Sequence, residues 1–327
     1  MIKLGRLNHC GIMTNYACTA ACRHCLYACS MERTGGYIAE NMMDEVCDAL
    51  KKGGCHSVHI GGGEPFMDFE ALLQLLQKLN RSGIAVDYIE TNAYWASDES
   101  QMKERLTRLS AVGVDALCIS IDPFHAEYIP LRLPLNLANH CRHLGFGYFL
   151  WQERFLPMLK NVDPNHSHDR AALEKNISPK YIHDTSQAYG LRMGGRAINI
   201  EEEYAMRKPF EHFLVSEPCR GLLSVNHFHI DMYGKFIPPG CTGFAIPMNE
   251  MLDGLPAGKY PVFEILLTKG AKGLADYAIE KGFTPDSQGY TSRCALCFHV
   301  RHWLSKHGEC PELDLEHYEH SLLYYDK

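Results

Sequence analysis

Two rhythms of apolar residues alternate along the first two thirds of the chain. Short apolar runs predict β-strands, and the stretches between them repeat apolar residues every three or four positions, the spacing of an amphipathic helix. The predicted strands span residues 10–13, 57–60, 85–89, 115–121, 148–151 and 191–197. The predicted helices span residues 37–54, 68–82, 97–112, 136–144 and 170–175. Alternation of this kind implies right-handed crossovers and a parallel sheet. We therefore expect an α/β fold, an open, TIM-like partial (β/α)6 barrel.

Polar motifs directly follow three of the predicted strands. Gly-Gly-Gly-Glu-Pro occupies residues 61–65, Glu-Thr-Asn occupies 90–92, and Asp-Pro-Phe-His occupies 122–125. In parallel α/β barrels, ligand-binding residues gather at the carboxyl ends of the strands. We therefore expect the three motifs to meet around one site.

The pattern changes after about residue 209. Two segments, 222–230 and 235–237, flank a turn at 231–234 and predict a β-hairpin, and a helix-rich span follows. We place a domain boundary near residue 215. The expected domains are the partial barrel over 1–215 and a smaller α+β domain over 216–327.

Composition and charge argue against several classes of protein. The 327 residues are 46% hydrophobic and 22% charged, and the net charge of −7 gives no overall attraction to nucleic acid. No apolar run approaches the roughly 20 residues of a membrane span. The first residues lack the apolar core of a signal peptide. We expect a cytoplasmic protein with neither DNA nor a membrane as its partner.

Fourteen cysteines in a chain without an export signal indicate metal ligation rather than disulfides. Cys18, Cys22 and Cys25 share one loop with the spacing C-x3-C-x2-C. Thiolates select iron–sulfur clusters, zinc or copper(I), and a four-iron cluster with only three thiolates keeps one iron open for another ligand. Five other cysteines lie on apolar faces and are expected in the core: Cys10, Cys47, Cys55, Cys118 and Cys141.

Two other interpretations of the cysteine loop stay open. Structural zinc sites usually show two C-x2-C-like pairs, which the x3 spacing fits poorly. Cys22, Cys25 and Cys29 read C-x2-C-x3-C, part of the run that holds a saturated ferredoxin cluster. That run continues with proline, where this chain has Ser30, and Cys18 is one residue too far away. We therefore favour a cluster with an open iron over one that only transfers electrons.

The loop of Cys18, Cys22 and Cys25 closely resembles the signature of the radical S-adenosylmethionine (SAM) superfamily. The resemblance implies that these cysteines bind a [4Fe–4S] cluster whose open iron is chelated by the amino and carboxylate groups of SAM. An electron from the cluster then cleaves SAM to methionine and a 5′-deoxyadenosyl radical. A reducing partner such as flavodoxin or ferredoxin is implied as well.

The resemblance extends to residues that contact SAM in the family. Gly62, Gly63 and Glu64 resemble its GGE motif, whose backbone holds the amino group of SAM. Glycines at this point let a ligand approach the backbone closely. His24 stands where the family usually has an aromatic residue that packs near adenine, and its planar ring suits that place.

Later strand ends supply further candidates by resemblance. Ser120 and Asp122 are similar to the family's ribose- and carboxylate-contacting positions. Thr91 and Asn92 are expected to reach SAM or substrate, and His125 is a candidate for substrate contact.

Residues 191–197, Leu-Arg-Met-Gly-Gly-Arg-Ala, resemble the family's final strand, whose backbone contacts adenine. The resemblance gives that role to Gly194. The arginine of this strand often points into the cavity, so we expect Arg196 to hold a substrate carboxylate through two hydrogen bonds. Arg196 and His125 are thus the candidate catalytic residues.

The last third of the chain contains five cysteines: Cys219, Cys241, Cys294, Cys297 and Cys310. The first four resemble the auxiliary-cluster module called twitch, a relative of the larger SPASM module, and this implies one auxiliary [4Fe–4S] cluster. The last three also resemble the open-iron module of the molybdenum-cofactor cyclase, so the place of Cys310 stays open. Structural zinc is the alternative for this group.

Together these resemblances imply an enzyme that abstracts hydrogen from a substrate and uses the auxiliary cluster to oxidise or crosslink it. Maturases of ribosomal peptides and dehydrogenases of small molecules share such modules. The first strand is predicted at residue 10, so we expect no N-terminal peptide-binding domain, which slightly weakens the peptide interpretation. The alternative is a non-catalytic electron carrier or cluster scaffold.

Overall fold

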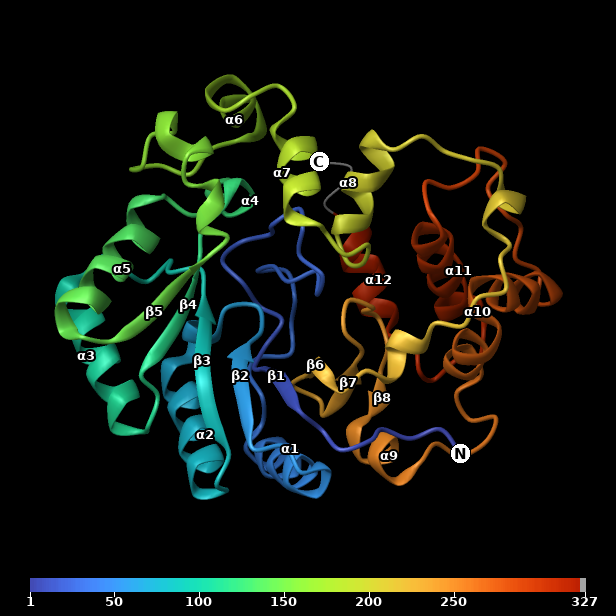
Figure 1. Cartoon of the computed structure of the whole chain (residues 1–327), viewed down its shortest axis with the longest axis horizontal. Helices are drawn as coiled ribbons and strands as arrows, with labels where there is room; N and C mark the ends of the chain where they lie inside the picture. Colours follow the sequence, from blue (N-terminus) through green and yellow to red (C-terminus); the bar gives the residue numbers. More distant parts are fainter. Residues whose placement is uncertain (324–327) are drawn as a thin grey trace.

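The computed structural model describes residues 1–323 and is built around one eight-stranded sheet (Figure 1). The strand order is β5-β4-β3-β2-β1-β6-β7-β8. Neighbours from β5 to β6 are parallel, whereas β7 and β8 are antiparallel. The sheet does not close, which confirms the expected open α/β barrel. The strands are β1 (His9–Met13), β2 (Ser57–Gly61), β3 (Ala85–Thr91), β4 (Ala116–Ser120), β5 (Gly147–Trp151), β6 (Asn226–Ile230), β7 (Lys235–Ile237) and β8 (Ile246–Pro247).

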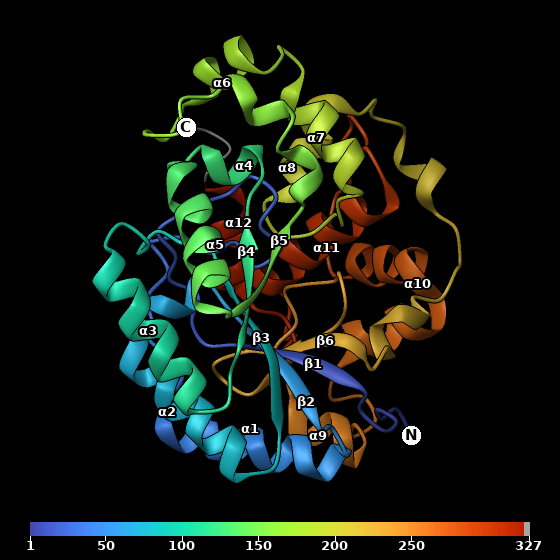
Figure 2. The same cartoon turned by 60° about the vertical axis from the view of Figure 1, so that its left-hand side comes forward.

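Four predicted helices connect the first five strands and cover the outer face of the sheet (Figure 2). They are α1 (Glu40–Gly53), α2 (Phe69–Arg81), α3 (Glu99–Ala111) and α5 (Arg132–Leu144). In α1 the expected apolar stripe of Met43, Val46 and Leu50 is buried, and Gly54 ends the helix in a left-handed conformation at φ 74°. The side chain of Asp68 caps α2 by accepting a hydrogen bond from the amide of Ala71. Gly54 and Asp68 are also the end of the predicted helix 37–54 and the start of the predicted helix 68–82.

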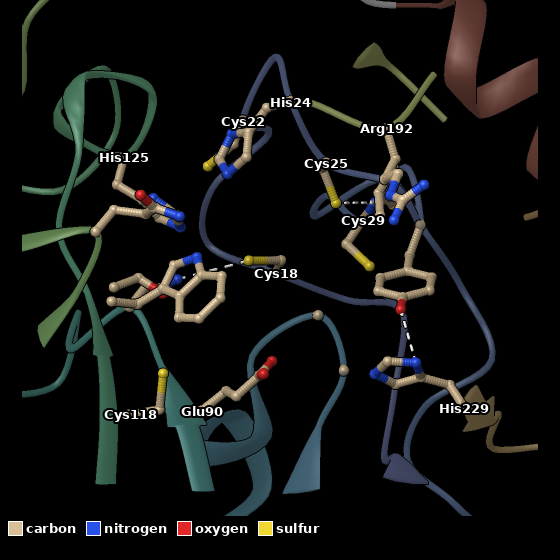
Figure 3. Close-up of a pocket in the computed structure, with 18 of the residues that line it drawn as sticks. Cys18, Cys22, His24, Cys25, Cys29, Glu90, Cys118, His125, Arg192 and His229 are labelled. Carbon is tan, nitrogen blue, oxygen red and sulfur yellow. Dashed lines mark hydrogen bonds between the residues drawn. The ribbon is translucent and has the colours of Figure 1, made fainter. Parts of the chain in front are cut away.

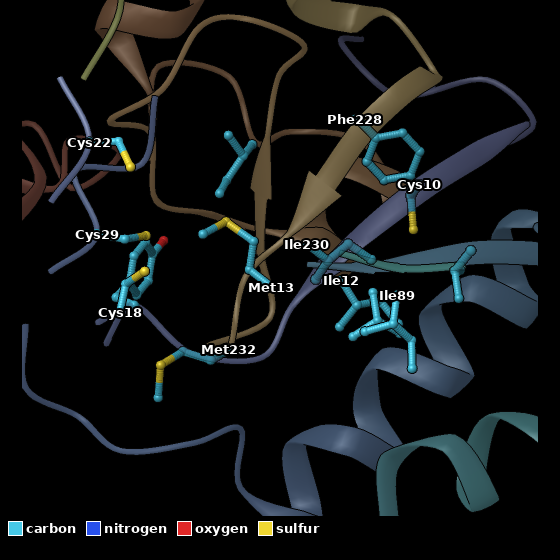
Figure 4. Packing of buried hydrophobic residues seen from close by; sticks show 14 of the residues in the cluster. Cys10, Ile12, Met13, Cys18, Cys22, Cys29, Ile89, Phe228, Ile230 and Met232 are labelled. Carbon is cyan, nitrogen blue, oxygen red and sulfur yellow. The ribbon is translucent and has the colours of Figure 1, made fainter. Parts of the chain in front are cut away.

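The core between sheet and helices fixes which residues face the cavity. Cys10 and Ile12 on β1 are fully buried and pack with Phe228 and Ile230 on β6 (Figure 4). Because side chains alternate across a strand, the intervening residues of β1 and β6 face the concave side of the sheet. The five cysteines assigned to the core are all buried.

The sixth parallel strand is not the one that we expected. Residues 191–196 form turns, and the helix α8 (Ala197–Tyr204) begins directly after them. Gly195, at φ 53°, brings this segment against the cysteine loop, where an added Cβ would lie 2.4 Å from the carbonyl oxygen of Cys25. The sixth parallel strand is β6, which pairs with β1 on the side of the sheet away from β5.

Short helices fill the span between β5 and β6 and cover the top of the barrel in Figure 1. The predicted helix at 170–175 is present as α6. The elements of this region, together with two short helices after β2 and β4, are η1 (Pro65–Asp68), α4 (Pro123–Ala126), η2 (Glu153–Phe155), η3 (Met158–Asn161), α6 (Arg170–Asn176), α7 (Tyr181–Tyr189), η4 (Phe210–Phe213) and η5 (Arg220–Leu223).

The predicted hairpin is present as β6 and β7, and helices follow it as expected: α9 (Met248–Asp253), α10 (Pro261–Glu280), α11 (Arg293–His307) and α12 (Leu315–Leu322). The sheet runs without a break across residue 215, because β6 pairs with β1. The division into 1–215 and 216–327 stays a prediction. Among the described residues, no helix has the length and apolar character needed to cross a membrane.

Candidate active site

A cavity of about 710 Å³ lies at the carboxyl ends of the parallel strands, between the cysteine loop and residues 189–192 (Figure 3). Most of the predicted site residues line it, although they come from separate strands. These are Cys18, Cys22, His24, Cys25, Gly62, Gly63, Glu64, Thr91, Asn92, Ser120 and His125.

Cys18, Cys22 and Cys25 lie on one loop that wraps the cavity (Figure 3). A turn brings the last two together, with the amide of Cys25 donating to the carbonyl oxygen of Cys22 at 3.1 Å. Cys29 lines the same cavity, and its amide donates to the Cys25 Sγ at 3.4 Å. A hydrogen bond from Cys29 lowers the pKa of the Cys25 thiol well below its ordinary value. The donor set is that of a soft-metal centre.

Arg196 braces this loop and does not reach the cavity. Its guanidinium is buried, with Nε donating to the carbonyl oxygen of Cys22 at 3.0 Å and Nη2 to that of Cys29 at 2.7 Å. The amide of Arg196 donates to the carbonyl oxygen of Cys25 at 3.0 Å. The prediction that Arg196 holds a substrate carboxylate in the cavity is therefore wrong.

Arg192, four residues earlier, lines the cavity in place of Arg196. Gly194 lies outside the lining as well, next to Thr242 and Leu26, and its predicted contact with adenine stays a prediction. The expectation for Arg196 assumed that residues 191–197 form a strand with alternating side chains. The segment forms turns instead, and Arg192 faces the cavity.

The glycines after β2 permit a close approach between two loops. The amide of Gly63 donates to the carbonyl oxygen of Asn15 at 2.7 Å, and that of Glu64 donates to the carbonyl oxygen of Ala17 at 2.9 Å. A Cβ on Gly63 would lie 1.9 Å from the Ala17 oxygen. This contact places the GGE motif against Ala17, the residue before Cys18.

The side chain of Glu64 connects this motif to the end of β3. Its carboxylate accepts hydrogen bonds from the Thr91 hydroxyl at 2.9 Å and from the Asn92 amide at 2.7 Å. Burial raises the pKa of Glu64 to about 7, and these hydrogen bonds only partly oppose the shift. Asn92 Nδ2 donates to Thr19 Oγ1 at 3.1 Å and to the Cys18 Sγ at 3.5 Å. Three sequence motifs thus form one hydrogen-bonded unit.

Gly63→Ala is expected to destabilise the protein, because the new methyl group meets the backbone of Ala17 and not a movable side chain. We expect a loss of about 1–3 kcal/mol in the free energy of unfolding, measured by denaturant titration. Gly5→Ala is the matched control, since no atom lies within 4 Å of its Cβ position. If both variants were as stable as the wild type, the close contact between the GGE motif and Ala17 would not contribute to the stability of the protein.

Asp122 lies behind two histidines and not in the cavity wall. It caps α4, accepting from the His125 amide at 2.9 Å, and its Oδ2 lies 2.8 Å from His125 Nδ1 and 3.9 Å from His24 Nε2. Burial raises the pKa of this carboxyl, but His125 and His24 more than offset it and bring the pKa to about 2. Asp122 is therefore an orienting partner of the histidines, and its predicted contact with ribose stays a prediction.

His24 and Ser120 line the cavity, and their predicted contacts with SAM stay predictions. The ring of His24 packs on Phe124 with centroids 4.9 Å apart and on Tyr189 at 5.1 Å. Burial lowers the pKa of His24 to about 4, so its ring is neutral. A neutral, planar ring in the wall of the cavity is suited to stacking against a base.

Several lining residues were missed in the sequence. Glu90, Cys118, Trp151, Tyr189 and His229 all line the cavity. Glu90 and Trp151 stand at ends of predicted strands, so their position was a usable signal. Burial, with a smaller contribution from Glu64, raises the pKa of Glu90 to about 7.

Four of the C-terminal cysteines form a second group. Burial raises the pKa of Cys219, and the neighbouring thiols of Cys297 and Cys294 raise it further. Burial likewise raises the pKa of Cys241, to which Cys294 and Cys219 contribute. Arg301 hydrogen-bonds the Cys297 thiol. The helix α11 places two of the four one turn apart, as C-x2-C spacing predicts.

Cys310 lies apart from this group. The groups that influence its thiol are Glu312, Lys281 and Tyr277, and none of the four cysteines is among them. The sequence left the place of Cys310 open, and these surroundings favour a site formed by the other four cysteines alone. It packs beside α10 because the chain turns away after α11.

Comparisons with known proteins agree with the N-terminal motif. YydG of Bacillus subtilis (strain 168), whose name assigns it to peptide biosynthesis, is 26% identical over 125 residues. The alignment covers 38% of this chain and 39% of that protein, so the match spans about two fifths of the relative.

Two solved structures align with parts of this chain at low similarity. SuiB of Streptococcus suis bound to S-adenosylmethionine is 15% identical, covers 72% of this chain and 60% of its own, and has a TM-score of 0.41. The enzyme anSMEcpe with bound AdoMet and a Cp18Cys peptide is 16% identical, with coverage of 71% and 73% and a TM-score of 0.38. The family model described as the radical SAM superfamily matches residues 12–143, which hold the cysteine loop, the GGE motif and the ends of β3 and β4. The match to this family model is confined to residues 12–143.

Proposed function

We propose that the protein is a radical SAM enzyme that removes a hydrogen atom from a peptide and then oxidises or crosslinks it. One observation carries the proposal: Cys18, Cys22 and Cys25 line the same cavity as the GGE motif and Asn92. The relative YydG, by its name a peptide biosynthesis protein, supports a peptide over a small molecule.

The residues present fit a [4Fe–4S] cluster with an open iron. Three thiols share one loop, and Arg196 fixes that loop through two of its carbonyl oxygens. When bound there, the cluster together with SAM supplies a 5′-deoxyadenosyl radical. The loop excludes water on one side, because Cys18 and Cys22 are buried.

The rest of the cavity wall is arranged to bind SAM. The amides of Gly63 and Glu64 donate to the carbonyl oxygens of Asn15 and Ala17, and carbonyl oxygens of the motif would hold the ammonium group. An ammonium group donates hydrogen bonds, and carbonyl oxygens accept them. His24 offers its neutral ring to the base, and Ser120 offers a hydroxyl.

The opposite part of the cavity is suited to a polar substrate with apolar side chains. Arg192 is its cation, Glu90 its carboxyl group, and Trp151 a partly exposed aromatic surface. An arginine fork binds a carboxylate through two hydrogen bonds. We assign substrate positioning to Arg192, the role first predicted for Arg196.

We further propose one auxiliary [4Fe–4S] cluster at Cys219, Cys241, Cys294 and Cys297. Zinc held by thiolates at about 2.3 Å in a tetrahedron needs sulfur atoms about 3.8 Å apart. Among the described residues, groups of three or more potential ligands within 4.8 Å of one another occur only around histidines, not at these cysteines. The wider spacing favours a larger centre. Such a cluster would take the electron left on the substrate, and a flavodoxin or ferredoxin would supply the electron that starts the reaction.

The substrate class is tested with deuterium. The anaerobic, reconstituted protein is incubated with SAM, dithionite and a library of perdeuterated peptides, and 5′-deoxyadenosine is analysed by mass spectrometry. We expect deuterium in 5′-deoxyadenosine, because the radical takes the hydrogen atom directly from its substrate. Deuterium transfer from perdeuterated small metabolites and not from peptides would favour the dehydrogenase alternative.

A further inference from the structure

Four histidines to which the proposed SAM chemistry assigns no role meet on the concave side of the sheet. His9 lies on β1, His59 on β2, and His227 and His229 on β6, three strands that are adjacent in Figure 2. His9 Nε2 lies 2.9 Å from His59 Nδ1. His59 Nε2 lies 3.2 Å from His229 Nε2. The cluster therefore joins strands that are distant in the sequence.

Gly11 on β1 makes this meeting possible. A Cβ at Gly11 would lie 2.4 Å from Nε2 of His59 and at a similar distance from Nε2 of His229. A side chain at Gly11 would stand between the imidazoles of His59 on β2 and His229 on β6. The central strand thus carries a glycine where the rings cross over it.

The backbone of β6 is also distorted at the cluster. His227 has φ 59°, in the left-handed region that a residue with a side chain rarely adopts. The register between β1 and β6 shifts at this point, from His9 opposite Asn226 to Cys10 opposite Phe228. A bulge of this kind re-aims a side chain and commonly stands next to a functional site. Here it stacks the ring of His227 on that of His59, with centroids 4.9 Å apart.

The outer nitrogens of two of these rings have the partners that metal-binding histidines usually have. His9 Nδ1 lies 3.2 Å from the Asp87 carboxylate. His59 Nε2 faces His229, whose Nδ1 lies 3.0 Å from the Tyr27 hydroxyl. A carboxylate or another polar group on the second nitrogen fixes the ring and its tautomer when the first nitrogen binds a metal.

We propose that His9, His59 and His227 form a binding site for a divalent transition-metal ion of the zinc type, separate from both cysteine sites. One ligand atom from each of the three lies within 4.8 Å of the others. Three neutral imidazoles suit zinc, with nitrogen ligands at about 2.0–2.1 Å and about 3.4 Å from one another in a tetrahedron. His9 and His59 need to separate by only about half an ångström to reach that spacing.

The charges and the access around the cluster suit a cation. Asp87 and Glu90 bring two carboxyl groups to it, the second with Oε1 3.8 Å from His59 Nε2. His227 is exposed and lines the cavity of the radical SAM domain, whereas His59 is fully buried. Three protein ligands leave the fourth position of a tetrahedral ion open, and water or a substrate oxygen can occupy it from that side.

The experiment uses the full chain with its iron–sulfur sites reconstituted, so that the cysteines are occupied. One equivalent of Zn²⁺ is added, excess metal is removed, and zinc is measured by mass spectrometry and by X-ray absorption at the zinc edge. We expect about one zinc per chain with nitrogen or oxygen neighbours at about 2.0–2.1 Å. A zinc shell dominated by sulfur at about 2.3 Å would overturn the proposal.

Variants separate ligands from orienting residues. His59→Gln and His227→Gln are expected to lower zinc affinity by more than about 100-fold, and Asp87→Asn by about 10–100-fold, the range for an orienting partner. His166→Gln, on an exposed turn, is the matched control and keeps wild-type affinity. His227 is exposed, so its variant tests the site even if the buried His59 variant fails to fold, and iron content reports on folding in each. Wild-type protein that retains no zinc, or zinc binding unchanged in His227→Gln, would reduce the cluster to hydrogen-bonded histidines. The proposal does not depend on the identity of the radical SAM substrate.

Discussion

The variants Cys18→Ala, Cys22→Ala and Cys25→Ala are each expected to release no 5′-deoxyadenosine above background when reduced with dithionite in the presence of SAM. All three thiols line the cavity from one loop, and no other side chain of that loop except Cys29 offers a thiol there. Loss of a ligand should exceed the about 10–100-fold effect of losing an orienting residue. Chromatography of the nucleoside product, with iron content in parallel, provides the measurement.

Cys29→Ala is the control that decides between an open and a filled iron. Cys29 lines the same cavity: its amide donates to Cys25 Sγ, its carbonyl oxygen accepts from Arg196, and its thiol lowers the pKa of the Cys25 thiol through a hydrogen bond. Its replacement removes a thiol while those backbone groups remain. We expect SAM cleavage to persist in Cys29→Ala. If this variant alone lost cleavage, the ligand assignment would be wrong, and a stable cluster without SAM cleavage in wild type would favour an electron carrier.

The candidate site was largely predictable because its residues follow strands. In a parallel sheet every crossover returns the chain in the same direction, so the carboxyl ends of β2, β3 and β4 meet at one edge. Glu64, Asn92 and Ser120 therefore come together from motifs up to 56 positions apart, and the structure places all three at the cavity. That prediction needed only the positions of the motifs at the ends of strands, and no knowledge of which residues are in contact.

The fold after β5 was less predictable because local pattern and long-range pairing compete there. Residues 191–197 alternate like a strand, yet they form turns and do not pair with β5, whose outer edge carries no other strand of the described sheet. The glycines of this segment favour a turn against the cysteine loop instead. Strand propensity is a property of the segment alone. Membership of a sheet also depends on the long-range contacts that the segment makes.

Side-chain direction explains the remaining misplaced residues. Arg192 and Arg196 share a short segment, and only the turn between them decides which one faces the cavity. Asp122 follows β4 directly, but as the cap of α4 it is turned towards His125. The four histidines of β1, β2 and β6 gave no motif, since their meeting depends on a glycine on the strand between them.

The triple variant of Cys18, Cys22 and Cys25 to Ala is expected to retain about four irons and four sulfides per chain, half of the wild-type content. The four remaining ligands come from the residue before η5, the loop after β7 and α11, and no cysteine of the N-terminal loop is among the groups that influence the thiols of Cys219 and Cys241. A centre that is fully held by protein has no open iron, so its electron paramagnetic resonance spectrum should not respond to SAM. Iron and sulfide analysis with this spectrum provides the measurement.

Two single changes in the triple background give the matched pair. Cys297→Ala should remove the second cluster, because that thiol lies among the other three and is hydrogen-bonded by Arg301. Cys310→Ala should leave iron content unchanged, because that thiol lies beside Tyr277 and Lys281. Iron loss in Cys310→Ala would instead support a three-cysteine, open-iron centre.

Zinc in place of iron after anaerobic purification with both metals present would rule out electron transfer at this site, because zinc has no redox chemistry. A substrate radical formed in the cavity would then need another electron acceptor.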